Sequence, residues 1–178
     1  MTKRISIIFI VLFFCFCQTS RNEDVKKIIK KWQGREILIP DEIIFKTLGR
    51  DTVYTHLWEK TYKIFTYIDS IGCSSCQLGL TDWKKLINIC QQQKIDLEFV
   101  FVVHSSDFEH FDNDVILYDF DYPIIYDYHN RFNKLNKFPP IPYSTFLLDK
   151  ENKIVLVGSP INNPAMWDLY KKVIEMKK

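Results

Sequence analysis

The chain has 178 residues, of which 47% are hydrophobic and 15% are aromatic. This length fits a single domain, and the apolar content excludes an intrinsically disordered chain. The 24 basic and 22 acidic residues nearly balance, which argues against a nucleic-acid-binding protein that relies on a broad basic surface.

The first seventeen residues have the pattern of an export signal. Lys3 and Arg4 precede an apolar run of roughly a dozen residues, whereas a membrane-spanning helix needs about 20. Polar residues take over at Gln18. We therefore expect residues 1–17 to be a signal peptide that directs the protein to the cell envelope.

The cysteine that ends this segment has two interpretations. Cys17 resembles the lipidated cysteine of bacterial lipoproteins, which would tether the mature chain to a membrane. Phe16 stands where that signal prefers a small residue, so ordinary cleavage after Cys17 is the alternative. We favour lipidation of Cys17.

Residues 18–59 are expected to form an N-terminal extension. A helix through Lys31 would place Val25, Ile28, Ile29 and Trp32 on one side, and Gly34 would end it. Residues 36–40 and 43–46 are apolar and β-branched, and they predict two short strands around a turn.

Residues 60–178 alternate between strand and helix patterns. Strands are predicted at 61–68 and 95–103, a short extended piece at 122–127, and a hairpin at 143–149 and 153–158. Helices are predicted at 74–92, 107–118, weakly at 129–137, and at 163–176. This order predicts an α/β fold with a central mixed β-sheet flanked by helices.

The motif with the clearest chemistry is the Cys-Ser-Ser-Cys run that follows Gly72. It lies between a predicted strand and a predicted helix, where unpaired N–H groups and the helix dipole stabilise a thiolate. Cys73 is therefore the candidate nucleophile. Cys76, held one turn away, is the candidate resolving thiol that attacks a mixed disulfide.

A zinc site is the competing interpretation of two close cysteines, and it needs two further ligands. Cys90 lies 14 residues beyond Cys76 on the same predicted helix, about 21 Å away, so it cannot join one metal shell. The four histidines are scattered without ligand spacing: His56, His104, His110 and His129. We expect no metal and a buried, structural Cys90.

These features resemble the thioredoxin-like superfamily, in particular the redoxin or TlpA-like thiol-disulfide oxidoreductases of the bacterial cell envelope. The resemblance rests on the strand, Cys-Ser-Ser-Cys and helix unit, and on residues 141–149, which read Ile-Pro-Tyr-Ser-Thr-Phe-Leu-Leu-Asp. It implies a thioredoxin-like domain over residues 60–178. Residues between Phe108 and Phe138 resemble the insertion that precedes the cis-proline strand in this branch.

The resemblance also implies functional residues. Ile141 and Pro142 would contact the substrate beside the active-site disulfide, together with Gly72, and the Cys73–Cys76 disulfide would be the redox centre without a further cofactor. One departure concerns Tyr67, which stands where thioredoxin has a buried acid. No histidine lies between the cysteines, so a reductase or isomerase is favoured over a strong oxidant.

Three functions fit the sequence. The leading hypothesis is an exported oxidoreductase that exchanges disulfides with protein thiols of the envelope and is recharged by an unidentified electron donor. The second is a binding lipoprotein in which the Cys73–Cys76 disulfide is only structural. The third is a thiol peroxidase, which wants an arginine near its reactive thiol; Arg131 is the only arginine after Arg50, and the sequence does not place it there.

Overall fold

The computed structural model describes residues 23–69, 79–139 and 144–176. A helix covers residues 23–32. The strands are β1 (Phe45–Thr47), β2 (Arg50–Thr52), β3 (Lys63–Ile68), β4 (Glu98–Val103), β5 (Ile124–Tyr126), β6 (Thr145–Leu148) and β7 (Ile154–Val157). The labelled helices are α3 (Leu80–Gln92), α4 (Phe108–Leu117), α5 (Arg131–Asn136) and α6 (Pro164–Glu175).

The strands form one mixed sheet in the order β2-β1-β5-β4-β3-β6-β7. β3, β4 and β5 are parallel, and the remaining neighbours pair antiparallel. Every residue of β3 and β4 is buried, as expected for central strands that are covered on both faces. The predicted α/β class and mixed sheet are confirmed.

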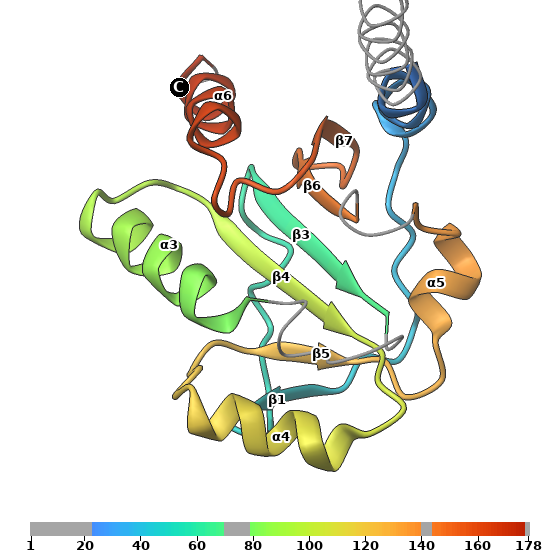
Figure 1. Ribbon diagram of the computed structural model, residues 1–178, viewed down its shortest axis with the longest axis vertical. Helices are drawn as coiled ribbons and strands as arrows, with labels where there is room; N and C mark the ends of the chain where they lie inside the picture. Colours follow the sequence, from blue (N-terminus) through green and yellow to red (C-terminus); the bar gives the residue numbers. More distant parts are fainter. Residues whose placement is uncertain (1–22, 70–78, 140–143, 177–178) are drawn as a thin grey trace, which may run out of the picture.

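Helices cover both faces of this sheet (Figure 1). On one face, α3, α4 and α6 pack their apolar side chains against alternate residues of β3 and β4, including Ile64, Phe99 and Phe101. On the other face, Phe65 and Val100 pack against α5 and the N-terminal extension. The alternation of side chains along each strand therefore divides the interior into two cores.

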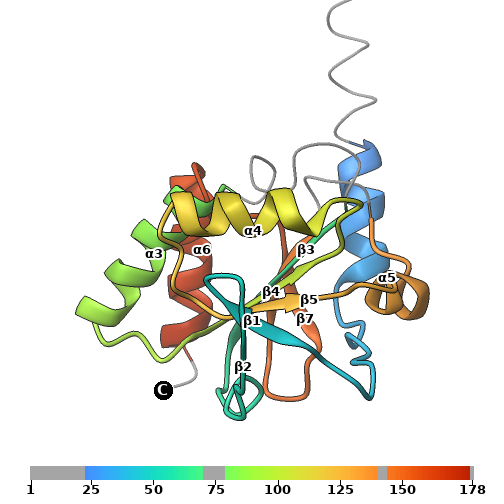
Figure 2. The same cartoon turned by 90° about the horizontal axis from the view of Figure 1, so that it is seen from below.

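The N-terminal extension is part of the second core. Trp32, at the end of the first helix, is 1% exposed and stacks on Phe146 of β6 with ring centroids 5.4 Å apart. Gly34 follows with φ +79°, and its N–H donates to the carbonyl of Ile154 at 2.7 Å. The predicted helix and its end at Gly34 are confirmed, and Figure 2 shows this helix beside α5.

The extension next runs along α5. Asn136, which is fully buried, donates from Nδ2 to the carbonyl of Leu38 and accepts the Leu38 N–H at Oδ1, both at 2.8 Å. One side chain thus pairs with both polar groups of a backbone residue, as a neighbouring strand would. Because a buried peptide group needs partners, this pair holds the extension to the domain.

Of the two strands predicted in the extension, the first is wrong, and the second is shifted, since β1 shares only Phe45 and Lys46 with the predicted 43–46. Within 36–40 only Glu36 forms an isolated bridge, to Lys153, and the hairpin begins later, at β1 and β2. Leu48 and Gly49 turn the hairpin with φ values of 50° and 72°. Pro40 has no N–H to donate to a neighbouring strand, which disfavours a strand at 36–40. Gly49 favours the left-handed backbone of a tight turn, and this glycine is the local sequence signal for the hairpin.

Side chains cap the amino ends of two later helices. Asn163 accepts the N–H of Met166 at 3.1 Å, and Pro164 occupies the first turn of α6. Asp107 caps α4 by accepting the N–H of His110 at 2.9 Å.

Within the described ranges, no helix is long and apolar enough to cross a membrane.

Candidate functional site

The residues singled out from the sequence lie outside the described ranges. Gly72, Cys73 and Cys76 fall in residues 70–78, Ile141 and Pro142 in residues 140–143, and Cys17 and the signal segment in residues 1–22. The structure describes the residues on either side of the first two segments. These flanking residues define the candidate site.

Both segments join the sheet at one edge, the carboxyl end of β3. Tyr67 donates its N–H to the carbonyl of Ser144 at 3.0 Å, and Thr66 pairs with Thr145. The chain leaves β3 towards Cys73 after Asp69 and returns into β6 at Ser144. The cysteine segment and the proline segment are therefore attached to adjacent strands at the same edge.

Tyr67, at the position where the resemblance expects an acid, is fixed and neutral. Its side chain is buried, its hydroxyl donates to Oδ1 of Asn130 at 2.8 Å, and its ring stacks on Phe138 with centroids 4.5 Å apart. Burial, with the charges of Asp69 and Asp127, raises the pKa of Tyr67 well above its usual value of 10. Tyr67 therefore cannot serve as a base near neutral pH.

His104 offers a base at the same edge. It directly follows β4, is half-buried, and its backbone N–H donates to the carbonyl of Ile68 at 2.9 Å. Its ring Nδ1 lies 2.8 Å from the carbonyl oxygen of Asp127. A carbonyl only accepts, so Nδ1 carries the hydrogen, and the neutral ring keeps its lone pair on Nε2.

The sequence interpretation treated His104 as one of four scattered histidines and missed its position. The signal was available in the strand order. His104 is the first residue after β4, in which residues 99–103 are all apolar, and parallel neighbours end at the same edge of a sheet. Register between β3 and β4 was needed to place it beside Ile68.

Asp127 shapes the turn between β5 and α5. Its two carboxylate oxygens accept the N–H groups of Arg131 at 2.7 Å and Phe132 at 2.9 Å, so this buried acid is committed to capping a helix. Arg131 itself points to the extension, where its Nη1 lies 2.8 Å from Oε2 of Glu42. The arginine that a peroxidase would need is thus engaged by a carboxylate.

Cys90 is a core residue, as predicted. It is 2% exposed on α3, and burial raises the pKa of its thiol to about 11. A thiol with such a pKa is protonated near neutral pH and is a poor nucleophile. Among the residues that the structure describes, no group of three or more histidine, cysteine or acidic side chains is arranged to hold a metal ion.

Comparison with known proteins gives a structural likeness only. No protein-family model matches the sequence, and no curated protein matches it. Among solved structures, the thioredoxin domain of a thiol-disulfide oxidoreductase from Bacteroides vulgatus aligns with a TM-score of 0.57 and 14% identity, over 80% of this chain and 97% of that one.

Two further structures extend the likeness. StoA from Bacillus subtilis aligns with a TM-score of 0.51 and 16% identity, over 73% of this chain and 98% of that one. AhpC from Enterococcus faecalis aligns with a TM-score of 0.55 and 16% identity, over 85% and 96%. Together with the mixed sheet and its flanking helices, these alignments show that the chain has a thioredoxin-like fold.

Proposed function

We propose that this protein is an exported thiol-disulfide oxidoreductase that works through Cys73 and Cys76. The observation that carries the proposal is that the cysteine segment follows β3 and the proline segment precedes β6. These adjacent strands are joined at that end by the Tyr67–Ser144 hydrogen bond. The fold, which is that of known thiol-disulfide oxidoreductases, supports the same function. A reductase or isomerase is favoured.

The proposed reaction is an exchange of two electrons. The Cys73 thiolate attacks a client disulfide, forming a bond to one client sulfur while the other leaves as a thiolate and takes up a proton. The Cys76 thiolate then attacks Cys73, which forms the Cys73–Cys76 disulfide and releases the first client sulfur. A dithiol donor returns the two electrons, and no other cofactor takes part.

Cys76 must lose a proton before it attacks, and we assign this proton to Nε2 of His104. Tyr67 is neutral and holds its proton, and the Asp127 carboxylate is used by α5. An imidazole nitrogen with a free lone pair can accept a proton and later return it. The departing client thiolate would receive the proton back.

The location proposed for this protein is the cell envelope. The support is the sequence of residues 1–17 and Cys17, which would carry the lipid of a membrane tether. Metabolic labelling with a palmitate analogue tests the tether. Label on the wild type and none on Cys17→Ser supports it, and an unlabelled wild type contradicts it.

The experiment that tests the function is trapping with Cys76→Ala, which leaves Cys73 unable to release a client. Client proteins should accumulate in mixed disulfides that a reductant dissolves, and Cys73→Ala/Cys76→Ala is the matched control that should trap none. A Cys73–Cys76 disulfide that resists reduction would favour the binding lipoprotein. Rapid oxidation by peroxide without protein clients would favour the thiol peroxidase.

A further inference from the structure

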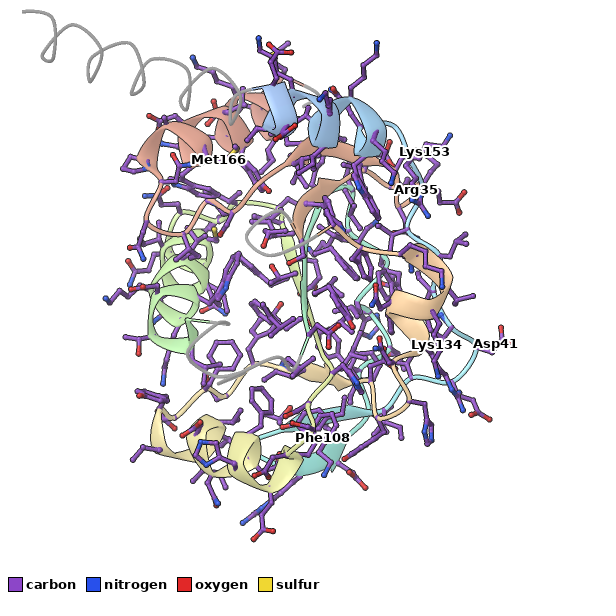
Figure 3. The ribbon with its side chains drawn as sticks, turned by 45° about the vertical axis from the view of Figure 1, so that its right-hand side comes forward. Arg35, Asp41, Phe108, Lys134, Lys153 and Met166 are labelled. Carbon is purple, nitrogen blue, oxygen red and sulfur yellow. The ribbon has the colours of Figure 1, made fainter. Side chains whose placement is uncertain are left out.

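An open cavity of about 120 Å³ lies where the extension meets the turn between β5 and α5. Both sides contribute apolar side chains to its lining: Pro40, Ile43, Ile44, Ile125 and Phe132. Figure 3 shows the two segments that flank this region, with Asp41 marking the extension and Lys134 marking α5. A cavity of roughly 150 Å³ accommodates benzene, so this one has room for a single aliphatic side chain.

The rim of the cavity carries charged and titratable groups. Arg131 and Glu42 form their ion pair there, and His129 also lines it. Arg131 and His129 both lower the pKa of Glu42. The second acid of the lining, Asp127, already accepts the N–H groups of Arg131 and Phe132.

The two partners of the ion pair are held differently. Arg131 stands in the first turn of α5, whose N–H groups are fixed by Asp127, and its side chain is 40% exposed. Glu42 belongs to a stretch without helix or strand, and its side chain is 79% exposed. An ion pair this exposed is weak in water, so another carboxylate can replace Glu42 on a guanidinium that stays in place.

The cavity lies near the carboxyl end of β3, the strand that leads to Cys73. Asn130 accepts the hydroxyl of Tyr67 near the end of β3, and the next residue, Arg131, stands on the cavity rim. β5 ends at Tyr126, which pairs with Val103, and Val103 pairs with Ile68. Two strand spacings, about 10 Å, therefore separate the end of β5 from the strand that leads to Cys73.

We propose that this cavity is a client-binding subsite that takes an aliphatic side chain and an adjacent carboxylate. The aliphatic group fills the space between Ile44 and Phe132, and the carboxylate replaces Glu42 on Arg131. The proposal rests on the proposed disulfide exchange and names its substrate class: acidic-aliphatic segments that flank a client disulfide. Glu42 then acts as an internal competitor for the site.

The test compares two disulfide-bonded peptides that differ in one residue, Leu-Glu against Leu-Gln, beside one cysteine. Arg131→Gln should raise KM for the Leu-Glu peptide about tenfold and leave KM for the Leu-Gln peptide unchanged. Glu42→Gln should lower KM for the Leu-Glu peptide about threefold, because the competitor is gone. Ile44→Ser should raise KM for both peptides.

Controls separate this outcome from loss of structure. Lys171→Gln breaks another exposed ion pair, to Asp168 at 2.9 Å on α6, and should change neither KM. A merely structural ion pair would make Arg131→Gln and Glu42→Gln shift KM in the same direction, which would overturn the proposal. Equal KM values of the wild type for the two peptides would also overturn it.

The failure of the proposed function has its own signature. A small aromatic disulfide needs no peptide subsite, so the wild type and the control Lys171→Gln should reduce it at equal rates. A wild type that reduces neither this reagent nor the peptides contradicts disulfide exchange itself. A wild type that reduces the reagent but shows no preference between the peptides contradicts the subsite alone.

Discussion

The polar side chains at the amino and carboxyl ends of the central strands differ in their hydrogen bonding. At the amino end, Glu98 is 6% exposed and accepts hydrogen bonds from the hydroxyls of Tyr54 and Tyr122. Lys63 is fully buried there and donates to the carbonyls of Lys60 and Lys150. This end is closed, and its polar groups link the extension, the β6–β7 turn and the insertion.

At the carboxyl end, two polar residues are each fixed by hydrogen bonds and keep another polar group that can exchange partners. His104 uses Nδ1 and keeps the Nε2 lone pair, and Arg131 is held by its backbone while its side chain has an exposed partner. Because a closed network stabilises and an open one can exchange partners, we assign stability to the amino end and chemistry to the carboxyl end. Substitutions at the two ends should separate the two properties.

The largest effect on stability is expected from Glu98→Ala at the amino end. The substitution leaves two tyrosine hydroxyls and the N–H of Phe99 without their shared acceptor, which should lower the free energy of unfolding by about 1–3 kcal/mol. Urea denaturation measures the loss. The rate of disulfide exchange under folding conditions should stay within about twofold of the wild type.

Glu98→Gln serves as the control because it keeps the volume and one acceptor oxygen. It should lose less than half as much stability as Glu98→Ala. If either variant slows disulfide exchange by more than about twofold under folding conditions, the assignment of stability to the amino end and chemistry to the carboxyl end is contradicted.

The converse is expected from His104→Gln at the carboxyl end. Without the ring nitrogen, release of the mixed disulfide should slow about tenfold at neutral pH, and the shape of the pH–rate profile should change. The free energy of unfolding should fall by only about 1 kcal/mol, the usual worth of one hydrogen bond.

His110→Gln is the matched control on the exposed side of α4, where His110 lies 3.4 Å from Asp114. It should leave both the rate and the pH profile unchanged. An unchanged pH–rate profile in His104→Gln would show that His104 takes no part in the reaction.

The sequence pattern predicted most of the sheet because β3, β4 and the β6–β7 hairpin are continuous apolar or alternating runs. It also predicted the start of the last helix near Asn163 and the burial of Cys90, which depend on local spacing. It was wrong about the first strand of the extension, because the conformation of that segment depends on distant partners: Leu38 donates its N–H to Asn136, almost a hundred residues away. Contacts of that range leave no local signal.

The candidate site was predictable only in part for the same reason. A strand, two cysteines and a helix are consecutive in the sequence, so the redox motif could be found locally. His104 and the adjacent pair Asn130 and Arg131 come from separate segments, and only strand register brings His104 and Asn130 beside the end of β3. Sequence reasoning therefore identifies the nucleophile and misses the residues that surround it.

The smallest effect is expected from Lys63→Met. Burial lowers the pKa of Lys63 from its usual 10.5, so between the lowered pKa and 10.5 the unfolded chain binds the proton more readily than the folded chain. The free energy of unfolding therefore gains from Lys63 as pH rises through this window. Lys63→Met should remove that gain and change stability by about 1 kcal/mol or less at neutral pH.

Lys60→Met is a control of opposite sign. The hydrogen bond and charge of Asp96, 2.7 Å away, raise the pKa of Lys60, so its contribution is present at lower pH and is lost as pH rises through the raised value. Urea denaturation at about pH 8 and about pH 10.5 measures both variants. Equal pH dependence in Lys63→Met and the wild type would contradict an ionisable, buried Lys63.

The most direct test of the account is a redox titration of the intact protein followed by mass spectrometry of the peptide that contains Cys73 and Cys76. We expect this peptide to lose two hydrogens reversibly as a thiol-disulfide buffer is made more oxidising, while Cys90 stays a thiol throughout. A Cys73–Cys76 pair that remains reduced, or remains oxidised, across the whole range would contradict disulfide exchange as the function of this protein.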